Sequence, residues 1–224
     1  MNRLAIFDCD GTLVDSGATI VATVVEAFAL HGFEPPAPVE CRRVIGLSLV
    51  EAMAMLAPNA EPGEQGALAE TYKTCFFRAR QEGRVEEPLF DGILDLLDAL
   101  EMDGWMLGVA TGKSMRGLVH CLDRHGIHAR FVSLQTADRH PSKPDPSMVV
   151  QAIADAGASP GSTFVIGDTA YDMGMARSAG AAALGAGWGY HDRSELLAGG
   201  AQAVADRPQS VMHLLPALME HIDG

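Results

Sequence analysis

The sequence predicts an α/β protein in which a parallel sheet is covered by helices on both faces and an all-helical block is inserted after the first strand. Two observations predict this fold class. Short apolar runs alternate with helical periodicity after Pro88, and no strand pattern occurs between residues 16 and 86. Alternation of strands and helices is typical of parallel sheets, whose functional residues gather at the carboxyl ends of the strands.

The first element is a short strand at residues 3–8. Its nearly continuous apolar run is typical of a strand that is buried on both faces of a sheet. Gly11 interrupts the run, and a helical pattern begins at Asp15. Gly32 is expected to end that helix, because glycine tolerates the left-handed backbone that commonly follows a helix.

The inserted block begins after this first strand. Two further helices are expected at about residues 39–57 and 64–83, separated by a loop that contains proline and glycine. We expect hinges at about 14–17 and 84–90. The predicted division assigns residues 1–15 and 87–224 to the core and residues 16–86 to the helical block.

The rest of the chain alternates between the two element types. Each of the first four predicted strands is preceded by a helix, which is the pattern of repeated crossover connections in a parallel sheet. The expected strands are 105–111, 131–135, 163–166, 181–185 and 201–205, and the expected helices are 91–103, 114–126, 145–157, 170–178 and 208–221.

Composition excludes several classes of protein. The chain has 224 residues, 48% of them apolar and 20% charged, which is typical of a globular protein. Its formal net charge of -13 argues against a nucleic-acid partner, because nucleic-acid binders usually carry a basic face. No stretch approaches the ~20 apolar residues of a membrane helix, and we expect no membrane association.

The cysteines predict a cellular compartment. Four widely spaced cysteines without a C-x-x-C pair indicate free thiols rather than a zinc site or a redox dithiol. Free thiols fit a reducing compartment, and the apolar run at the N-terminus is too short for a signal peptide. We therefore expect a cytoplasmic protein. The cysteines are Cys9, Cys41, Cys75 and Cys121.

The pentapeptide Asp8-Cys9-Asp10-Gly11-Thr12 is the strongest chemical signal in the chain. Asp8 and Asp10 are one residue apart on extended backbone and point the same way. One carboxylate can attack phosphorus and bind Mg²⁺, while the second can protonate a leaving group and activate water. The alternative interpretation is a solvated acidic turn.

Three more polar clusters follow predicted strands. Thr111-Gly112-Lys113 offers a hydroxyl and backbone N–H groups at a helix start, which suits a phosphate; the alternative interpretation is a helix cap with a surface lysine. Lys143 lies in a loop stiffened by two prolines, and Asp168 opens a helix. Taken singly, each cluster could be a helix cap or a solvated charge. Together they predict one crevice that binds Mg²⁺ and a phosphate.

The segments FDCDGTLVDS, VATGK, SKPDP and VIGDTAYDM resemble the four ordered motifs of the haloacid dehalogenase superfamily. The resemblance spans nearly the whole chain. It implies a Rossmann-like three-layer core, with residues 16–86 as the helical cap of the phosphoglycolate phosphatase-like branch. It also implies a Mg²⁺-dependent phosphatase that acts on a small phosphorylated metabolite, with phosphoglycolate as the first expectation.

The resemblance further implies a role for each motif residue. It implies that Asp8 is the nucleophile and a metal ligand, and that Asp10 is the general acid/base, whose backbone carbonyl also binds the metal. It implies that Thr111 and the amide of Gly112 bind the phosphoryl group, and that Lys143 stabilises this group and the nucleophile. Asp168 is implied to bind Mg²⁺ directly, Asp172 to be a more distant supporting carboxylate, and Thr12 to support the loop.

Several alternatives stay open. The resemblance implies that a dehalogenase or phosphonatase would lack the acid at Asp10, which speaks against both. A phosphosugar mutase is disfavoured because Leu47 and Ser48 follow the glycine of the cap turn where a basic residue is expected. A pyrophosphatase and a non-catalytic acidic binding module remain, as does a role for Arg43 in binding an anionic substrate group. The sequence gives no oligomeric state.

Overall fold

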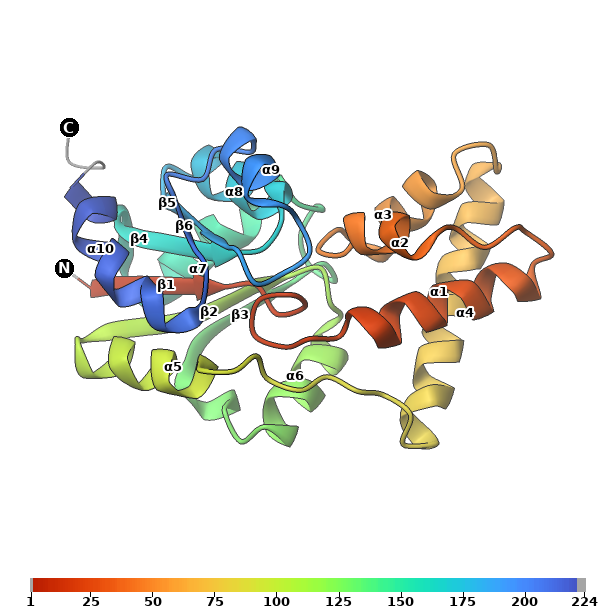
Figure 1. Cartoon of the computed structure of the whole chain (residues 1–224), viewed down its shortest axis with the longest axis horizontal. Coiled ribbons are helices and arrows are strands. Elements are labelled where there is room, and N and C mark those ends of the chain that lie inside the picture. The colour runs from red at the N-terminus through yellow and green to blue at the C-terminus, as the bar shows by residue number, and fades with distance from the viewer. Residues whose placement is uncertain (1, 221–224) are drawn as a thin grey trace.

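The computed structural model describes residues 2–220 and contains one six-stranded parallel sheet (Figure 1). Its strand order is β3-β2-β1-β4-β5-β6, so the N-terminal strand lies in the interior of the sheet. This arrangement confirms the predicted fold class. The strands are β1 (Asn2–Phe7), β2 (Trp105–Thr111), β3 (Phe131–Thr136), β4 (Ala158–Gly167), β5 (Ala182–Ala186) and β6 (Ala203–Ala205).

Helices cover both faces of the sheet and create two apolar cores. Ala5 and Phe7 of β1 face the first core, and the alternating residues Leu4 and Ile6 face the second. The first core is closed by α5 (Ile93–Met102), α6 (Met115–Arg124) and α10 (Val211–Glu220). The second is closed by α7 (Ser147–Ala156), α8 (Ala170–Ser178) and α9 (Arg193–Ala198).

The inserted segment forms a separate helical block beside the carboxyl ends of the strands (Figure 1). Its helices bury a core of their own around Val24, Phe28 and Met53. The two linkers run side by side, since the Asp15 amide donates to the Pro88 carbonyl at 2.8 Å. A division at residues 15/16 and 86/87 stays a prediction. The helices are α1 (Gly17–Leu30), α2 (Pro38–Arg43), α3 (Leu49–Leu56) and α4 (Pro62–Gln81).

The prediction of one helix at 39–57 is wrong. The segment forms two helices, α2 and α3, separated by a turn in which Gly46 has a φ of 98°. Such a backbone suits glycine and interrupts helical hydrogen bonding. The Ser48 hydroxyl then caps α3 by accepting from the Glu51 amide. The break matters because this turn contacts the functional site.

Smaller differences affect the ends of elements. Strand β4 begins at Ala158, five residues before its predicted start at Thr163. The predicted helix at 208–221 opens with a short 3₁₀ turn, Pro208–Ser210, and its last residue lies outside the described part of the chain. Another 3₁₀ turn, His128–Arg130, precedes β3.

The described residues also address two expectations from composition. None of the helices within residues 2–220 combines the length and the apolarity that a membrane crossing requires. All four cysteines are buried free thiols, and Cys9 packs in the first core as expected for its position.

Candidate active site

Polar residues from three neighbouring strands meet at the carboxyl edge of the sheet. Strand β1 pairs with β2 on one side and with β4 on the other. Asp8 continues β1, since its amide donates to the Ile166 carbonyl at 3.0 Å. Thr111 ends β2, and Asp168 directly follows β4. Parallel pairing therefore brings Asp8 together with residues that are more than a hundred positions away in sequence.

Lys143 joins two of the carboxylates in this cluster. Its Nζ lies 2.9 Å from Asp8 Oδ1 and 2.7 Å from Asp172 Oδ1, and its side chain is fully buried. Burial alone lowers the pKa of a lysine, but here the carboxylates of Asp172 and Asp8 outweigh burial and raise the pKa of Lys143. The ammonium therefore stays charged and holds both carboxylates in place.

Asp168 is held by donors on both of its oxygens. Thr12 Oγ1 donates to Oδ1 at 2.9 Å, and the Tyr190 amide donates to Oδ2 at 3.0 Å. Two glycines let the backbone approach this carboxylate: a Cβ atom on Gly11 would lie 2.2 Å from Oδ2, and one on Gly189 would lie 2.1 Å from Asp168 Cβ. The local sequence thus makes room for the carboxylate and fixes its orientation.

Asp172 lies in the first turn of α8, closer to the other carboxylates than expected for a distant supporting group. Its Oδ2 accepts from the Thr169 amide at 3.1 Å and from the Thr169 hydroxyl at 2.7 Å, which caps the helix. Carboxylate oxygens of Asp8, Asp168 and Asp172 all lie within 4.8 Å of one another. Asp172 therefore belongs to the same buried group.

This group fits a divalent cation. The three carboxylates are at most 1% exposed and face a single ammonium, which leaves an excess of negative charge among buried side chains. Burial raises the pKa of Asp8 to about 7 against the lowering effect of Lys143, and burial and Asp8 raise the pKa of Asp168 as well. Asp8 Oδ2 is buried without a hydrogen-bond partner within residues 2–220. A hard cation with oxygen ligands, such as Mg²⁺, would satisfy that oxygen and offset the charge.

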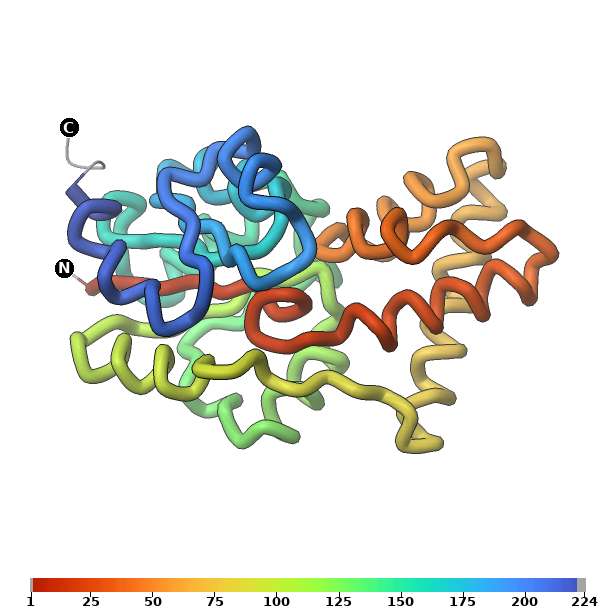
Figure 2. Tube along the Cα trace, in the orientation of Figure 1, coloured from red at the N-terminus to blue at the C-terminus, as the bar shows by residue number. Residues whose placement is uncertain are grey.

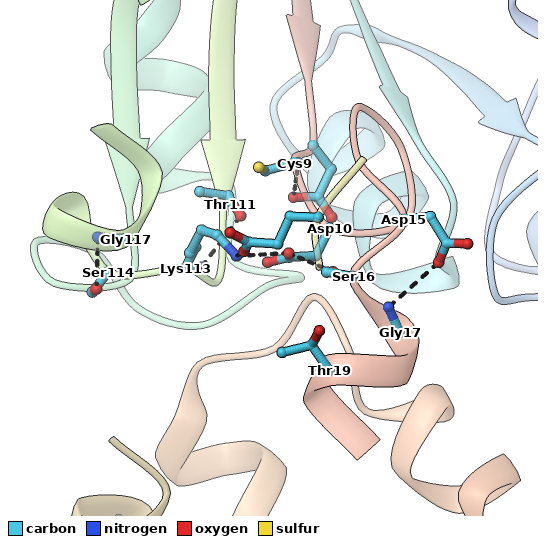
Figure 3. Close-up of polar contacts among 12 residues, drawn as sticks. Cys9, Asp10, Asp15, Ser16, Gly17, Thr19, Thr111, Lys113, Ser114 and Gly117 are labelled. Carbon is cyan, nitrogen blue, oxygen red and sulfur yellow. Dashed lines mark hydrogen bonds and ion pairs between the residues drawn. The ribbon is translucent and has the colours of Figure 1, made fainter. Parts of the chain in front are cut away.

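The Asp10 carboxylate points into a different set of contacts. Its Oδ1 accepts from the Ser16 hydroxyl at 2.6 Å and from Lys113 Nζ at 2.7 Å (Figure 3). Lys113 is thus not the surface lysine of the sequence interpretation. Its position two residues after Thr111 could have indicated a place in the site, because the chain has only three lysines.

Two further residues of this network were not predicted. Glu87, in the second linker, is 1% exposed and lies 2.8 Å from Lys113 Nζ and 3.6 Å from Arg80 Nη2. Burial lowers the pKa of Lys113, but the Asp10 and Glu87 carboxylates reverse this effect and raise it. The network connects α4, the linker and the sheet. No sequence pattern indicates it, because the contacts depend on how the block packs.

Of the two phosphate-binding candidates, Gly112 meets the turn between α2 and α3, and Thr111 Oγ1 accepts from the Lys113 amide at 3.2 Å. A Cβ atom on Gly112 would lie 2.3 Å from the Leu47 carbonyl oxygen, so only glycine fits there. A Cβ atom on Gly46 would lie 3.7 Å from Asp8 Oδ2. The helical block therefore covers the carboxylate cluster directly.

Arg43 lies outside this cluster. Its guanidinium makes an ion pair with Glu195 at 3.0 Å on the surface, and its carbonyl oxygen is 3.2 Å from His191 Nε2. The arginine therefore links the helical block to α9. Nothing in its contacts brings it to the carboxylates.

The glycine-rich segment after β5 is hydrogen-bonded to the first loop. Trp188 Nε1 donates to the Thr12 carbonyl at 3.0 Å, and the Ser16 amide donates to the Tyr190 hydroxyl at 3.1 Å. Figure 2 shows this segment beside the loop that follows β1. The segment thus supports both the loop and Asp168.

Comparison with known proteins identifies the relatives of this chain. The sequence model of the haloacid dehalogenase-like hydrolases matches residues 5–186. A probable phosphatase, IndB, of Dickeya dadantii is 32% identical, covering 98% of this chain and 96% of its own length. An N-acetylmuramic acid 6-phosphate phosphatase of Pseudomonas aeruginosa is 28% identical, covering 95% and 94%. A phosphoglycolate phosphatase of Agrobacterium fabrum is 29% identical, covering 86% and 83%.

Solved structures agree with this relationship. The crystal structure of a hydrolase from Pseudomonas syringae superimposes with a TM-score of 0.84 at 26% identity, covering 97% of this chain and 99% of that one. Both the sheet and the helical block are included in a match of that extent. Together with the family match, the similarity shows that this chain belongs to the haloacid dehalogenase-like hydrolases and is a phosphatase.

Proposed function

We propose that the protein is a Mg²⁺-dependent phosphatase that hydrolyses a small phosphate monoester through an aspartyl-phosphate on Asp8. One observation carries the proposal. Among the described residues, Asp8 Oδ2 is a buried carboxylate oxygen without a hydrogen-bond partner, while its other oxygen is bound by Lys143 and by the Cys9 amide at 2.6 Å. A carboxylate that is oriented through one oxygen and offers the other to a cation is suited to attack on phosphorus.

The cation would be held by Asp8, Asp168 and the backbone carbonyl of Asp10. When bound, it supplies positive charge that offsets the charge of the phosphoryl group and the carboxylates. Lys143 adds a second positive charge beside Asp8. Because the site is buried, each of these interactions is stronger than it would be in water.

The chain's own groups account for the proton transfers and for phosphate binding. Asp10 protonates the leaving oxygen and then removes a proton from the water that hydrolyses the aspartyl-phosphate. Ser16 and Lys113 orient its carboxylate. Thr111 and the Gly112 amide bind the transferring phosphoryl group.

Residues 16–86 would act as a cap domain that excludes water from this chemistry. The paired linkers at Asp15 and Pro88 and the contact of Gly46 with the cluster support this role. The buried free cysteines are consistent with the expected cytoplasmic location. Phosphoglycolate stays the first prediction from branch resemblance, and the relatives' names include it among other small phosphate esters.

The test is phosphate release from p-nitrophenyl phosphate by the purified protein. We expect turnover with Mg²⁺, loss of turnover with EDTA, and recovery when Mg²⁺ is restored. Asp8→Asn and Asp168→Asn should each abolish turnover while the proteins stay folded. Activity that survives both EDTA and Asp8→Asn would contradict the proposal.

A further inference from the structure

A large cavity lies between the helical block and the sheet. It has a volume of about 680 Å³, which is in the range that accommodates drug-sized ligands. Asp10, Gly112 and Lys113 line one end, beside the carboxylate cluster. The leaving group of a phosphate ester bound at Asp8 would extend into this space.

The cavity is present while the helical block rests on the sheet. The Ser48 amide donates to Ser142 Oγ at 2.8 Å, and the turn at Leu47 touches Gly112. Arg43 and Glu195 make a further contact between block and core. The volume therefore does not arise from separation of the two parts, and a closed block still leaves room for a bulky group.

One wall of the cavity is apolar and aromatic. The rings of Tyr72 and Phe76 on α4 stack with centroids 5.9 Å apart. The Arg80 guanidinium and Lys113 Nζ lie 5.1 Å and 5.8 Å from the Phe76 centroid, which fixes that ring. Fixed aromatic surfaces favour a flat or ring-shaped partner that covers them. Further apolar lining includes Ile20, Val24, Val44, Ile45, Leu49 and Leu56.

Two cations beside this wall are already compensated. Lys113 is paired with Asp10 and Glu87, and Arg80 lies 3.6 Å from Glu87. A second carboxylate on a substrate, as in phosphoglycolate, would therefore compete with protein carboxylates for both. A third cation of the lining, Arg116, lies over the Phe77 ring, 5.3 Å from its centroid.

We infer, on the basis of the proposed function, that the preferred substrates are phosphate monoesters whose leaving alcohol carries a ring. Sugars and nucleosides share this feature. A two-carbon acid does not, because it would leave most of the apolar wall in contact with water. The inference thus departs from the phosphoglycolate expectation at the level of substrate class and keeps the chemistry at Asp8.

The test compares kcat/KM by phosphate release with Mg²⁺ over two groups of substrates. The ring-bearing group contains hexose 6-phosphates, N-acetylhexosamine 6-phosphates and nucleoside 5′-monophosphates, and the acyclic group contains phosphoglycolate and glycerol 3-phosphate. We expect the best ring-bearing substrate to exceed both acyclic ones by about tenfold or more, the value of one good aromatic contact. Within the ring-bearing group, the substrates with the higher kcat/KM show whether the protein prefers a sugar or a nucleoside.

Preference for phosphoglycolate or glycerol 3-phosphate would overturn the inference while leaving the proposed function intact. Loss of all turnover, including that of p-nitrophenyl phosphate, would instead overturn the proposed function. The two failures are therefore distinguishable in one assay plate.

Variants of the aromatic wall give an independent readout. Phe76→Ala should lower kcat/KM for the best ring-bearing substrate by about tenfold and that for phosphoglycolate by less than about twofold. Phe76→Leu retains apolar volume without a flat ring and should show the same selectivity if Phe76→Ala folds poorly. Leu30→Ala, exposed on α1 outside the cavity, is the control and should change neither. An equal loss for both substrates in Phe76→Leu would overturn the inference.

Discussion

The ammonium of Lys143 lies 2.9 Å from Asp8 Oδ1, and neither side chain is exposed to solvent. The chain thus contains a buried ion pair whose carboxylate has one bound oxygen and one that has no partner in the described part of the chain. Burying such a pair costs several kcal/mol per ion before the attraction is counted, so stability alone does not explain it. A chemical role for the second oxygen does.

Lys143→Met tests this relationship. The change leaves two buried carboxylates without their cation, which costs about 3–5 kcal/mol of stability. It also removes a charge that stabilises the phosphoryl group, so kcat should fall by about a hundredfold or more. Thermal unfolding and steady-state kinetics measure the two effects.

Arg84→Met is the matched control, because Arg84 forms an exposed pair with Glu82. It should change both quantities little, as expected for a surface ion pair. Normal activity in Lys143→Met would mean that the lysine only supports the fold.

Thr12→Val tests the support of Asp168. The variant removes the hydroxyl that donates to Asp168 Oδ1 at 2.9 Å and keeps the shape of the side chain. Loss of a group that orients a metal ligand typically weakens metal binding, so the Mg²⁺ concentration for half-activation should rise about 10–100-fold. Thr74→Val, whose hydroxyl bonds only to its own helix, should leave the Mg²⁺ titration unchanged. Identical titrations for the two variants would exclude a role for Thr12 in metal binding.

Gly112→Ala tests the contact between the sheet and the helical block. The new methyl group would lie 2.3 Å from the Leu47 carbonyl oxygen and 2.7 Å from that of Gly46, so the turn must move. Misplacement of about 1 Å near the chemistry can cost about a hundredfold in rate, and we expect kcat/KM to fall by that order.

Gly66→Ala serves as its control. This glycine lies inside α4 with no atom within 4 Å of an added Cβ, and alanine favours helix there by about 0.5–1 kcal/mol. The variant should be as active as the wild type and slightly more stable. Wild-type activity in Gly112→Ala would show that the turn does not restrict the site.

The raised pKa of Asp8 predicts a pH dependence of stability without metal. Its pKa is about 7 in the folded protein and 3.8 in an ordinary carboxyl, so between these values the folded state holds a proton that the unfolded state has lost. The free energy of unfolding should therefore fall as pH rises from about 4 to about 7 and should level off above. Asp8→Asn should remove this part of the slope.

Mg²⁺ should counteract that loss. The cation binds the ionised carboxylates, so the increase in melting temperature on adding Mg²⁺ should be larger at pH 8 than at pH 5.5. Thermal unfolding of the wild type and of Asp8→Asn at both pH values measures it. An equal shift at both pH values would mean that Asp8 does not bind the cation.

The sequence sufficed for those parts of the fold that local patterns determine. Alternation of apolar runs located the strands, and strand ends located Asp8, Thr111 and Asp168, because parallel pairing brings such ends together. The prediction of one helix at 39–57 failed for a local reason. The backbone at Gly46 takes a positive φ, which a glycine permits but does not require.

Other features depend on contacts that no local pattern contains. The pairing of Lys113 with Glu87 requires the linker after α4 to return beside the first loop. The support of Asp168 comes from the backbone amide of Tyr190, and backbone donors leave no side-chain signal in a sequence. Arg43 was a candidate for binding an anionic substrate group, but its guanidinium pairs with Glu195 at the surface.

Detection of the phosphorylated enzyme tests most directly whether Asp8 is the nucleophile. The protein is mixed with p-nitrophenyl phosphate and Mg²⁺, quenched in acid within one turnover, digested and examined by mass spectrometry. We expect a peptide that carries one phosphoryl group on Asp8. It should form no later than inorganic phosphate is released, and it should be absent from Asp8→Asn. Release of inorganic phosphate with no phosphorylated Asp8 peptide at any quench time, or full turnover by Asp8→Asn, would contradict this role of Asp8.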